Sequence, residues 1–229
     1  MELIQAPTLA ELIKRHGKLP EQRVTSIATQ MLDVLDAAHA LGVVHRAVKP
    51  SNILIASGDV VKLAGFGIAH GHEDTRLTRA GHVIGTQAYM APELFSGGAI
   101  TPAADMWSLG ATLFHAAEGA GPFDRGSAAA TLNAILMEGL PRPACRSPLA
   151  EAISALPVRE PARRADSGRV RALLRDPAAD PRFYQETAFA AGAGSAEAGS
   201  TGTASPSAAG SDAAFGQRLK DAFESKLTP

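Results

Sequence analysis

One short stretch of the chain, Val44–Leu54, gathers the side chains most able to do chemistry. Its polar members, in chain order, are His45, Arg46, Lys49, Ser51 and Asn52. Between them stands Ala47, which has no side-chain group that can accept a proton. A His–Arg pair taken alone is as typical of an ordinary core or surface position as of a functional site. The meaning of the stretch therefore depends on the motifs that follow it along the chain.

Four further motifs follow in a fixed order. They are Gly65-Phe66-Gly67, then Tyr89-Met90-Ala91-Pro92-Glu93 shortly after Gly85-Thr86, then Asp105-Met106-Trp107-Ser108-Leu109-Gly110, and finally Glu160-Pro161-Ala162-Arg163-Arg164. Together with Val44–Leu54 they resemble the C-terminal lobe of a bacterial, eukaryotic-like serine/threonine protein kinase. Five motifs in the family's order over residues 1 to about 175 make a chance match very improbable.

The resemblance implies roles for most of the polar residues of the first stretch. His45 is expected in the core, and Arg46 at the place that receives a phosphate on the activation segment. Lys49 would neutralise the transferred phosphate and Asn52 would help to hold a magnesium ion. Leu54 would form the floor beneath the adenine. Glu2 and Ile4, in a segment resembling the hinge between the two kinase lobes, complete what we interpret as a vestigial nucleotide site.

Other matched residues serve the fold in the family. The aspartate equivalent to Asp105 ties down the backbone of the catalytic loop. The resemblance also implies an ion pair between Glu93 and Arg164, and structural roles for Phe66 and Trp107.

Two positions depart from the family's chemistry. Ala47 stands where the family keeps the aspartate that accepts the proton of the attacking hydroxyl, a contribution of about 10²–10⁴-fold in rate. Gly65 stands where the family keeps the aspartate that binds magnesium. Asn52 remains, but a single neutral amide is a poor site for a hard divalent cation. We therefore expect no intact catalytic or metal site.

The start of the chain gives a third departure. Because Met1–Ile4 resembles the hinge, we expect the N-terminal lobe, with its Gly-rich phosphate loop, to be absent, and no Gly-x-Gly-x-x-Gly occurs in the sequence. A mis-assigned start would explain this departure alone.

Periodicity predicts the elements that position these motifs. Apolar residues at steps of three and four predict a helix over Arg23–Leu41 that Gly42 ends, and a helix from Thr101-Pro102 to about Glu118 with Thr101 as its cap. Two short apolar runs around Ser57–Asp59 predict a β-hairpin. Thr8–Ile13 resembles the helix just after the hinge in the family. The remaining expected elements are helices from Ser127 to Gly139, over Pro148–Leu156 and over Asp166–Arg175, and a loop over His70–Tyr89.

These elements predict a mainly α fold, a kinase-like C-lobe with a helical bundle and a small β-hairpin. The expected domain runs over 1–176, with a hinge remnant at 1–7. An Ala/Gly/Ser/Thr-rich disordered linker is expected over 177–211 and a short amphipathic helix over 212–229. That helix could dock on a partner or fold back over bare apolar surface, and the sequence favours the second slightly.

Composition excludes several classes. The formal net charge is −1, without the basic bias of nucleic-acid or membrane-surface proteins. A single cysteine, Cys145, excludes an internal disulfide and is expected to be a partly buried thiol. Without a signal peptide or a long apolar run, a cytoplasmic protein is expected.

Three functions remain open at this stage. The first is an inactive, pseudokinase-like module that regulates or scaffolds a protein partner, such as an active kinase, without a cofactor. The second is a working serine/threonine kinase that uses ATP and magnesium, with its N-lobe lost by mis-annotation. The third is a non-functional gene fragment. Thr75 and Thr78, near Arg76 and Arg79, are possible phosphorylation sites or simply solvated threonines.

Overall fold

The computed structural model describes residues 5–66, 87–145 and 147–175. In chain order, the elements are α1 (Leu9–His16), α2 (Glu21–Ala40), β1 (Ile53–Ala56), β2 (Val60–Leu63), α4 (Pro92–Phe95), α5 (Pro102–Glu118), α6 (Ala128–Met137), α7 (Pro148–Ala155) and α8 (Ser167–Arg175). The predicted mainly helical fold with one β-hairpin is confirmed for this part of the chain. The predicted linker and C-terminal helix, and residues 70–86 of the predicted loop, lie outside the described residues.

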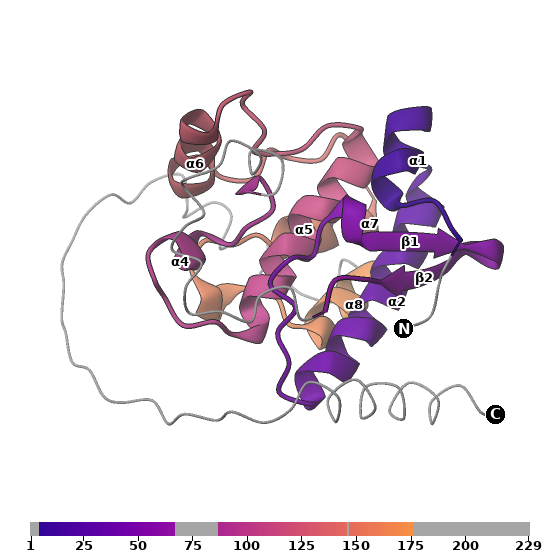
Figure 1. The fold of residues 1–229 in the computed structure, drawn as a ribbon, viewed down its shortest axis with the longest axis horizontal. Coiled ribbons are helices and arrows are strands. Elements are labelled where there is room, and N and C mark those ends of the chain that lie inside the picture. The colour runs from indigo at the N-terminus through magenta and orange to yellow at the C-terminus, as the bar shows by residue number, and fades with distance from the viewer. Residues whose placement is uncertain (1–4, 67–86, 146, 176–229) are drawn as a thin grey trace. The chain divides into compact units, whose positions relative to one another are not determined.

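Helix α5 is the central element of the fold. Of its 17 residues, 13 are buried, as expected for a helix that is apolar on all sides. It packs against α2 and α7, and Figure 1 shows it in the middle of the helices. Gly110 allows the close approach to the residues directly after α7, because a Cβ atom there would lie 2.6 Å from Leu156 Cβ and 2.7 Å from Pro157 Cδ.

The two N-terminal helices form for local reasons that the sequence shows. Thr8 and Glu11 make a capping box: Glu11 N–H donates to Thr8 Oγ1 (3.1 Å) and Thr8 N–H to Glu11 Oε2 (2.7 Å). Helix α2 begins at Glu21, two residues earlier than predicted, directly after Pro20. It ends at Ala40, and Gly42 follows with a φ of 74°, which suits the predicted stop signal.

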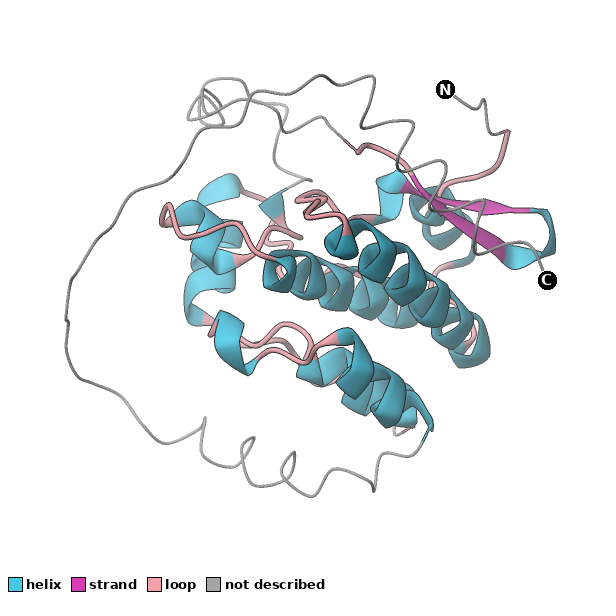
Figure 2. Cartoon of the chain, turned by 90° about the horizontal axis from the view of Figure 1, so that it is seen from below, coloured by secondary structure: helices cyan, strands magenta, loops and turns pink. Residues whose placement is uncertain are grey.

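The predicted hairpin is confirmed. Strands β1 and β2 pair antiparallel with Ile53 opposite Leu63 and Ala56 opposite Val60. Figure 2 shows this hairpin at one edge of the helical part. Gln30 on α2 fixes it, since its amide accepts from Val61 N–H (2.9 Å) and donates to Asp59 O (3.0 Å).

The start of α5 differs in one detail from the helix start that the sequence predicts. Thr101 occupies the cap position, but its side chain makes no capping hydrogen bond, so that predicted contact is wrong. The backbone supplies the acceptor instead: Ala104 N–H donates to Thr101 O at 3.0 Å. At α6 the predicted cap is present, because Ser127 Oγ accepts from Ala130 N–H, and the helix ends two residues before Gly139.

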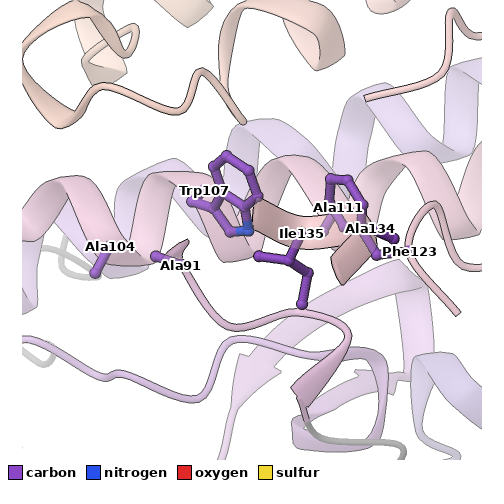
Figure 3. Packing of buried hydrophobic residues seen from close by; sticks show 7 residues of the cluster. All are labelled: Ala91, Ala104, Trp107, Ala111, Phe123, Ala134 and Ile135. Carbon is purple, nitrogen blue, oxygen red and sulfur yellow. The ribbon is translucent and has the colours of Figure 1, made fainter. Parts of the chain in front are cut away.

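One apolar cluster joins α5 to the elements on one side of it. Its members come from α5, α6 and the turns before α4 and α6: Ala91, Ala104, Trp107, Ala111, Phe123, Ala134 and Ile135 (Figure 3). Trp107 and Phe123 stack with their ring centroids 5.4 Å apart. Such stacking adds about 0.5–1.5 kcal/mol beyond area burial.

Candidate functional site

Asp105, in the first turn of α5, holds the stretch that contains Ala47. Its carboxylate is fully buried and accepts the backbone N–H of His45 (2.8 Å) and of Arg46 (2.7 Å). The Nε2 atom of His39, on α2, lies 2.8 Å from the same carboxylate. Arg46 has a φ of 66°, a strained value for a residue other than glycine. The buried carboxylate therefore fixes a turn that the chain would not favour by itself.

His45 connects this turn to the segment after β2. Its ring is buried, its Nε2 atom lies 2.9 Å from Ala64 O, and its Nδ1 atom accepts from Ala47 N–H at 3.2 Å. The ring meets Phe66 edge-on, with centroids 4.6 Å apart. Burial lowers the pKa of His45, which favours the neutral ring with a proton on Nε2 that this geometry requires.

The backbone around Ala47 is fixed although the side chain is a methyl group. Asn52 Nδ2 donates to Ala47 O at 2.8 Å. Thr112 Oγ1, on α5, donates to Val48 O at 3.3 Å. Lys49 follows, partly buried, and desolvation lowers the pKa of its ammonium group. The loop thus keeps its shape, while no carboxylate stands at position 47.

Gly65 and Leu54 lie on the two sides of the hairpin's base. Gly65 follows β2 with a φ of 88° and carries no side chain. Leu54, half-buried in β1, is paired with Lys62 and makes an isolated bridge to Thr8. Glu2 and Ile4, the other residues of the predicted nucleotide site, lie outside the described residues, as do Thr75 and Thr78.

The kinase family that the sequence resembles uses a magnesium ion with the nucleotide phosphates. The described residues do not offer the ligands that this ion prefers. Asn52 offers a single neutral ligand atom, its amide oxygen, while its NH₂ group donates to Ala47 O. Gly65 offers no oxygen from a side chain. Within the described ranges, no group of three or more His, Cys, Asp or Glu side chains could hold a metal. Magnesium sites in proteins are built on carboxylates.

The residues matched to structural roles come together. Arg164 and Glu93 form a bidentate ion pair with N–O distances of 2.5 and 2.7 Å. The Arg164 guanidinium also donates to Val158 O, Arg159 O and Ala103 O and lies 5.1 Å from the ring centroid of Trp107. This arrangement joins α4, α5 and the segment before α8.

The sequence did not predict a groove that lies beside the loop around Ala47. It has a volume of about 600 Å³, and its lining comprises Ala10, Ile13, Lys14, Gly17, Lys49, Pro50, Ser51, Tyr89, His115 and Gly119. In its wall the Tyr89 hydroxyl lies 2.6 Å from His115 Nδ1. Burial raises the pKa of Tyr89 and lowers that of His115, which favours a tyrosine donating to a neutral histidine. No local sequence pattern joins residues so far apart.

Two remaining expectations concern the Cys145 thiol and membrane-spanning helices. Cys145 is a free, partly buried thiol as predicted, and burial raises its pKa. Among the described residues, none of the helices has the length and apolar character that crossing a bilayer would require.

Comparison with known proteins places this geometry in context. The family model for the protein kinase domain matches residues 1–164. The chain is 42% identical over 148 residues to the serine/threonine-protein kinase PknH of Mycobacterium bovis, covering 65% of this chain and 25% of that protein. It is 41% identical over 143 residues to PknD (62% and 22%) and 39% identical over 148 residues to PknE (65% and 26%), both of Mycobacterium tuberculosis. The chain spans about a quarter of the length of these relatives.

Proposed function

The chain belongs to the protein kinase domain family, and from that premise we propose that it is a non-catalytic, pseudokinase-like module that regulates or scaffolds a protein partner. The observation that carries this proposal is the pair Ala47 and Gly65. Phosphoryl transfer in the family depends on a carboxylate at each position, one for the attacking hydroxyl and one for magnesium. Neither alanine nor glycine can supply one.

The retained contacts support a binding role. Asp105 still orders the turn at His45 and Arg46, and the bidentate pair of Glu93 and Arg164 still joins distant segments. A chain that keeps these buried charges in paired geometry keeps an ordered fold and, with it, a defined surface. Such a surface can bind a partner without chemistry.

Nucleotide binding tests this proposal. We expect the thermal midpoint of the full chain to show no magnesium-dependent rise on titration with ATP, because a ligand that binds only the folded state would raise it. The reference is the Ala47→Asp/Gly65→Asp variant, which regains both carboxylates. A magnesium-dependent rise in the wild-type chain would contradict the proposal.

The second candidate is a working serine/threonine kinase. Its support is the 42% identity to a protein named as such and the retention of Lys49 and Asn52 in the loop. Transfer of phosphate to a protein substrate, lost in Asn52→Ala, would favour this candidate over the first.

A further inference from the structure

Three titratable side chains from different parts of the chain meet near the end of α5. Tyr89 comes from the segment before α4, His115 from the last turn of α5, and Asp124 from the turn before α6. The Tyr89 hydroxyl lies 2.6 Å from His115 Nδ1, and the two rings stack with centroids 6.1 Å apart and an interplanar angle of 12°. The proposed function does not use this cluster.

Gly121 lies against all three side chains. A Cβ atom built on it would lie 3.9 Å from His115 Nδ1, 4.0 Å from the Tyr89 hydroxyl oxygen and 3.7 Å from Asp124 Cβ. The three side chains therefore border one small space, which a residue without a side chain leaves open. Asp124 is exposed, and its charge acts on both Tyr89 and His115.

The other charges around His115 come from several elements. Lys14 on α1 and Lys49 line the groove beside it, and Lys49 has an interaction partner of its own. On α5 itself, the Glu118 carboxylate accepts a backbone N–H from another segment at 2.7 Å. Burial lowers the pKa of His115 and outweighs the opposing attraction to Asp124, so the ring is neutral at pH 7.

The contact between Tyr89 and His115 depends on where the ring carries its proton. A neutral ring with the proton on Nε2 accepts from the Tyr89 hydroxyl through Nδ1. A protonated ring has N–H groups on both nitrogens and cannot accept. The Tyr89 oxygen must then accept from Nδ1–H, and the hydroxyl proton must turn to another acceptor. The Asp124 carboxylate can be that acceptor, and it also attracts the new positive charge.

The segments that carry Tyr89 and Asp124 also pack around Trp107. Ala91, two residues after Tyr89, is fully buried in the apolar cluster around Trp107. Phe123, directly before Asp124, stacks on Trp107 (Figure 3). New hydrogen bonds at Tyr89 and Asp124 therefore alter the surroundings of the indole ring. Because the chain has a single tryptophan, its fluorescence reports on this change.

We propose that Tyr89, His115 and Asp124 form a pH-dependent switch. With His115 neutral, the Tyr89 hydroxyl donates to the ring and holds the segment before α4 against α5. With one proton from solvent bound to His115, the hydroxyl turns to Asp124, and the two segments shift beside Trp107. This inference goes beyond the proposed function, because the switch acts whether or not the chain transfers phosphate.

The test is an NMR titration of the full chain, labelled with ¹⁵N at its histidines, between pH 8 and pH 5. The His115→Gln variant identifies the signal of His115 by its loss. We expect this signal to show a ring with Nδ1 unprotonated at pH 7. Its midpoint should lie below the ordinary value of 6.5, because burial disfavours the charged form.

Two conservative variants should move this midpoint in opposite directions. Tyr89→Phe removes the donor to the neutral ring and should raise the midpoint by about half a pH unit or more. Asp124→Asn removes the attraction to the charged ring and should lower it by about 0.3 pH units. The matched control is Asp33→Asn, at an exposed carboxylate of α2 that pairs with Arg171, and it should leave the midpoint unchanged.

The fluorescence of Trp107 over the same pH range tests the link to the apolar cluster. We expect a transition at the midpoint of the His115 ring that His115→Gln lacks, with unchanged helix content by circular dichroism.

Four results would overturn the inference. They are a charged His115 ring at pH 7, midpoints that Tyr89→Phe and Asp124→Asn leave unchanged or shift in the same direction, no fluorescence transition at the His115 midpoint, or loss of helix at that midpoint. The last result would mean acid unfolding instead of a switch.

Discussion

At the scale of single residues, Asp105 explains why the loop keeps its form around Ala47. One buried carboxylate satisfies two backbone N–H groups of a turn that includes a residue with positive φ, and it also meets His39. The loss of a catalytic side chain at position 47 leaves these contacts untouched. Conformation and chemistry are therefore separable in this loop.

Asp105→Ala should lower the free energy of unfolding by about 3 kcal/mol or more, because it leaves buried donors without an acceptor. Chemical denaturation followed by circular dichroism measures the change. The control is Asp33→Ala, at a side chain that is 68% exposed, where a change within about 1 kcal/mol is expected. Equal losses in the two variants would mean that Asp105 does not hold the turn.

One buried histidine, His45, and one partly buried histidine, His115, predict how stability depends on pH. Burial lowers the pKa of His45 and of His115 from the ordinary value of 6.5, so the unfolded chain binds protons at a higher pH than the folded chain does. Their contribution to stability is complete above about 6.5 and is lost as the pH falls through the folded-state values.

Unfolding midpoints measured in urea between pH 7 and pH 5 test the direction of this pH dependence of stability. We expect stability to fall toward pH 5 and the fall to be shallower in His45→Gln, whatever the stability of that variant at pH 7. An unchanged slope in His45→Gln would contradict the assignment of a buried, neutral ring.

At the scale of elements, the pair of Glu93 and Arg164 is the main link between α4 and the C-terminal helices. The Arg164 side chain is 1% exposed and that of Glu93 is 12% exposed. Arg164 also donates to three backbone carbonyls and stacks on Trp107. A buried guanidinium with this many partners positions several segments at once.

Glu93→Gln should cost about 3–5 kcal/mol of stability, because it leaves the Arg164 charge buried without its counter-charge. The matched control is Glu138→Gln, which breaks the exposed pair with Arg125 and should cost less than about 1 kcal/mol. Thermal and urea unfolding of both variants make the comparison. Similar small losses would show that the buried pair does not link these elements.

At the scale of the whole molecule, the sequence predicted the elements better than their contacts. Apolar periodicity and caps located α2, α5 and the hairpin, because each of these signals is local. The contacts of Asp105 with residues about 60 positions earlier, and the pair of Glu93 and Arg164, were expected only through resemblance to a family. The Tyr89–His115 contact and the groove depend on tertiary packing, and no local sequence pattern predicts them.

The same distinction applies to function. Ala47 and Gly65 can be read in the sequence, and the structure adds that the loop around them is ordered by Asp105, Asn52 and Thr112. The groove, by contrast, forms only when α1 packs beside the loop. Finding it therefore needed the fold, whereas the proposal about lost catalysis needed two residues.

The most direct test of the central claim is transfer of radiolabelled phosphate from the γ-position of ATP by the purified full chain, with magnesium and a generic acceptor protein. The proposed non-catalytic role predicts no transfer above the signal of the Asn52→Ala variant, either to the acceptor or to the chain itself. Transfer by the wild-type chain that Asn52→Ala abolishes would contradict it, and would show that this loop works without a carboxylate at positions 47 and 65.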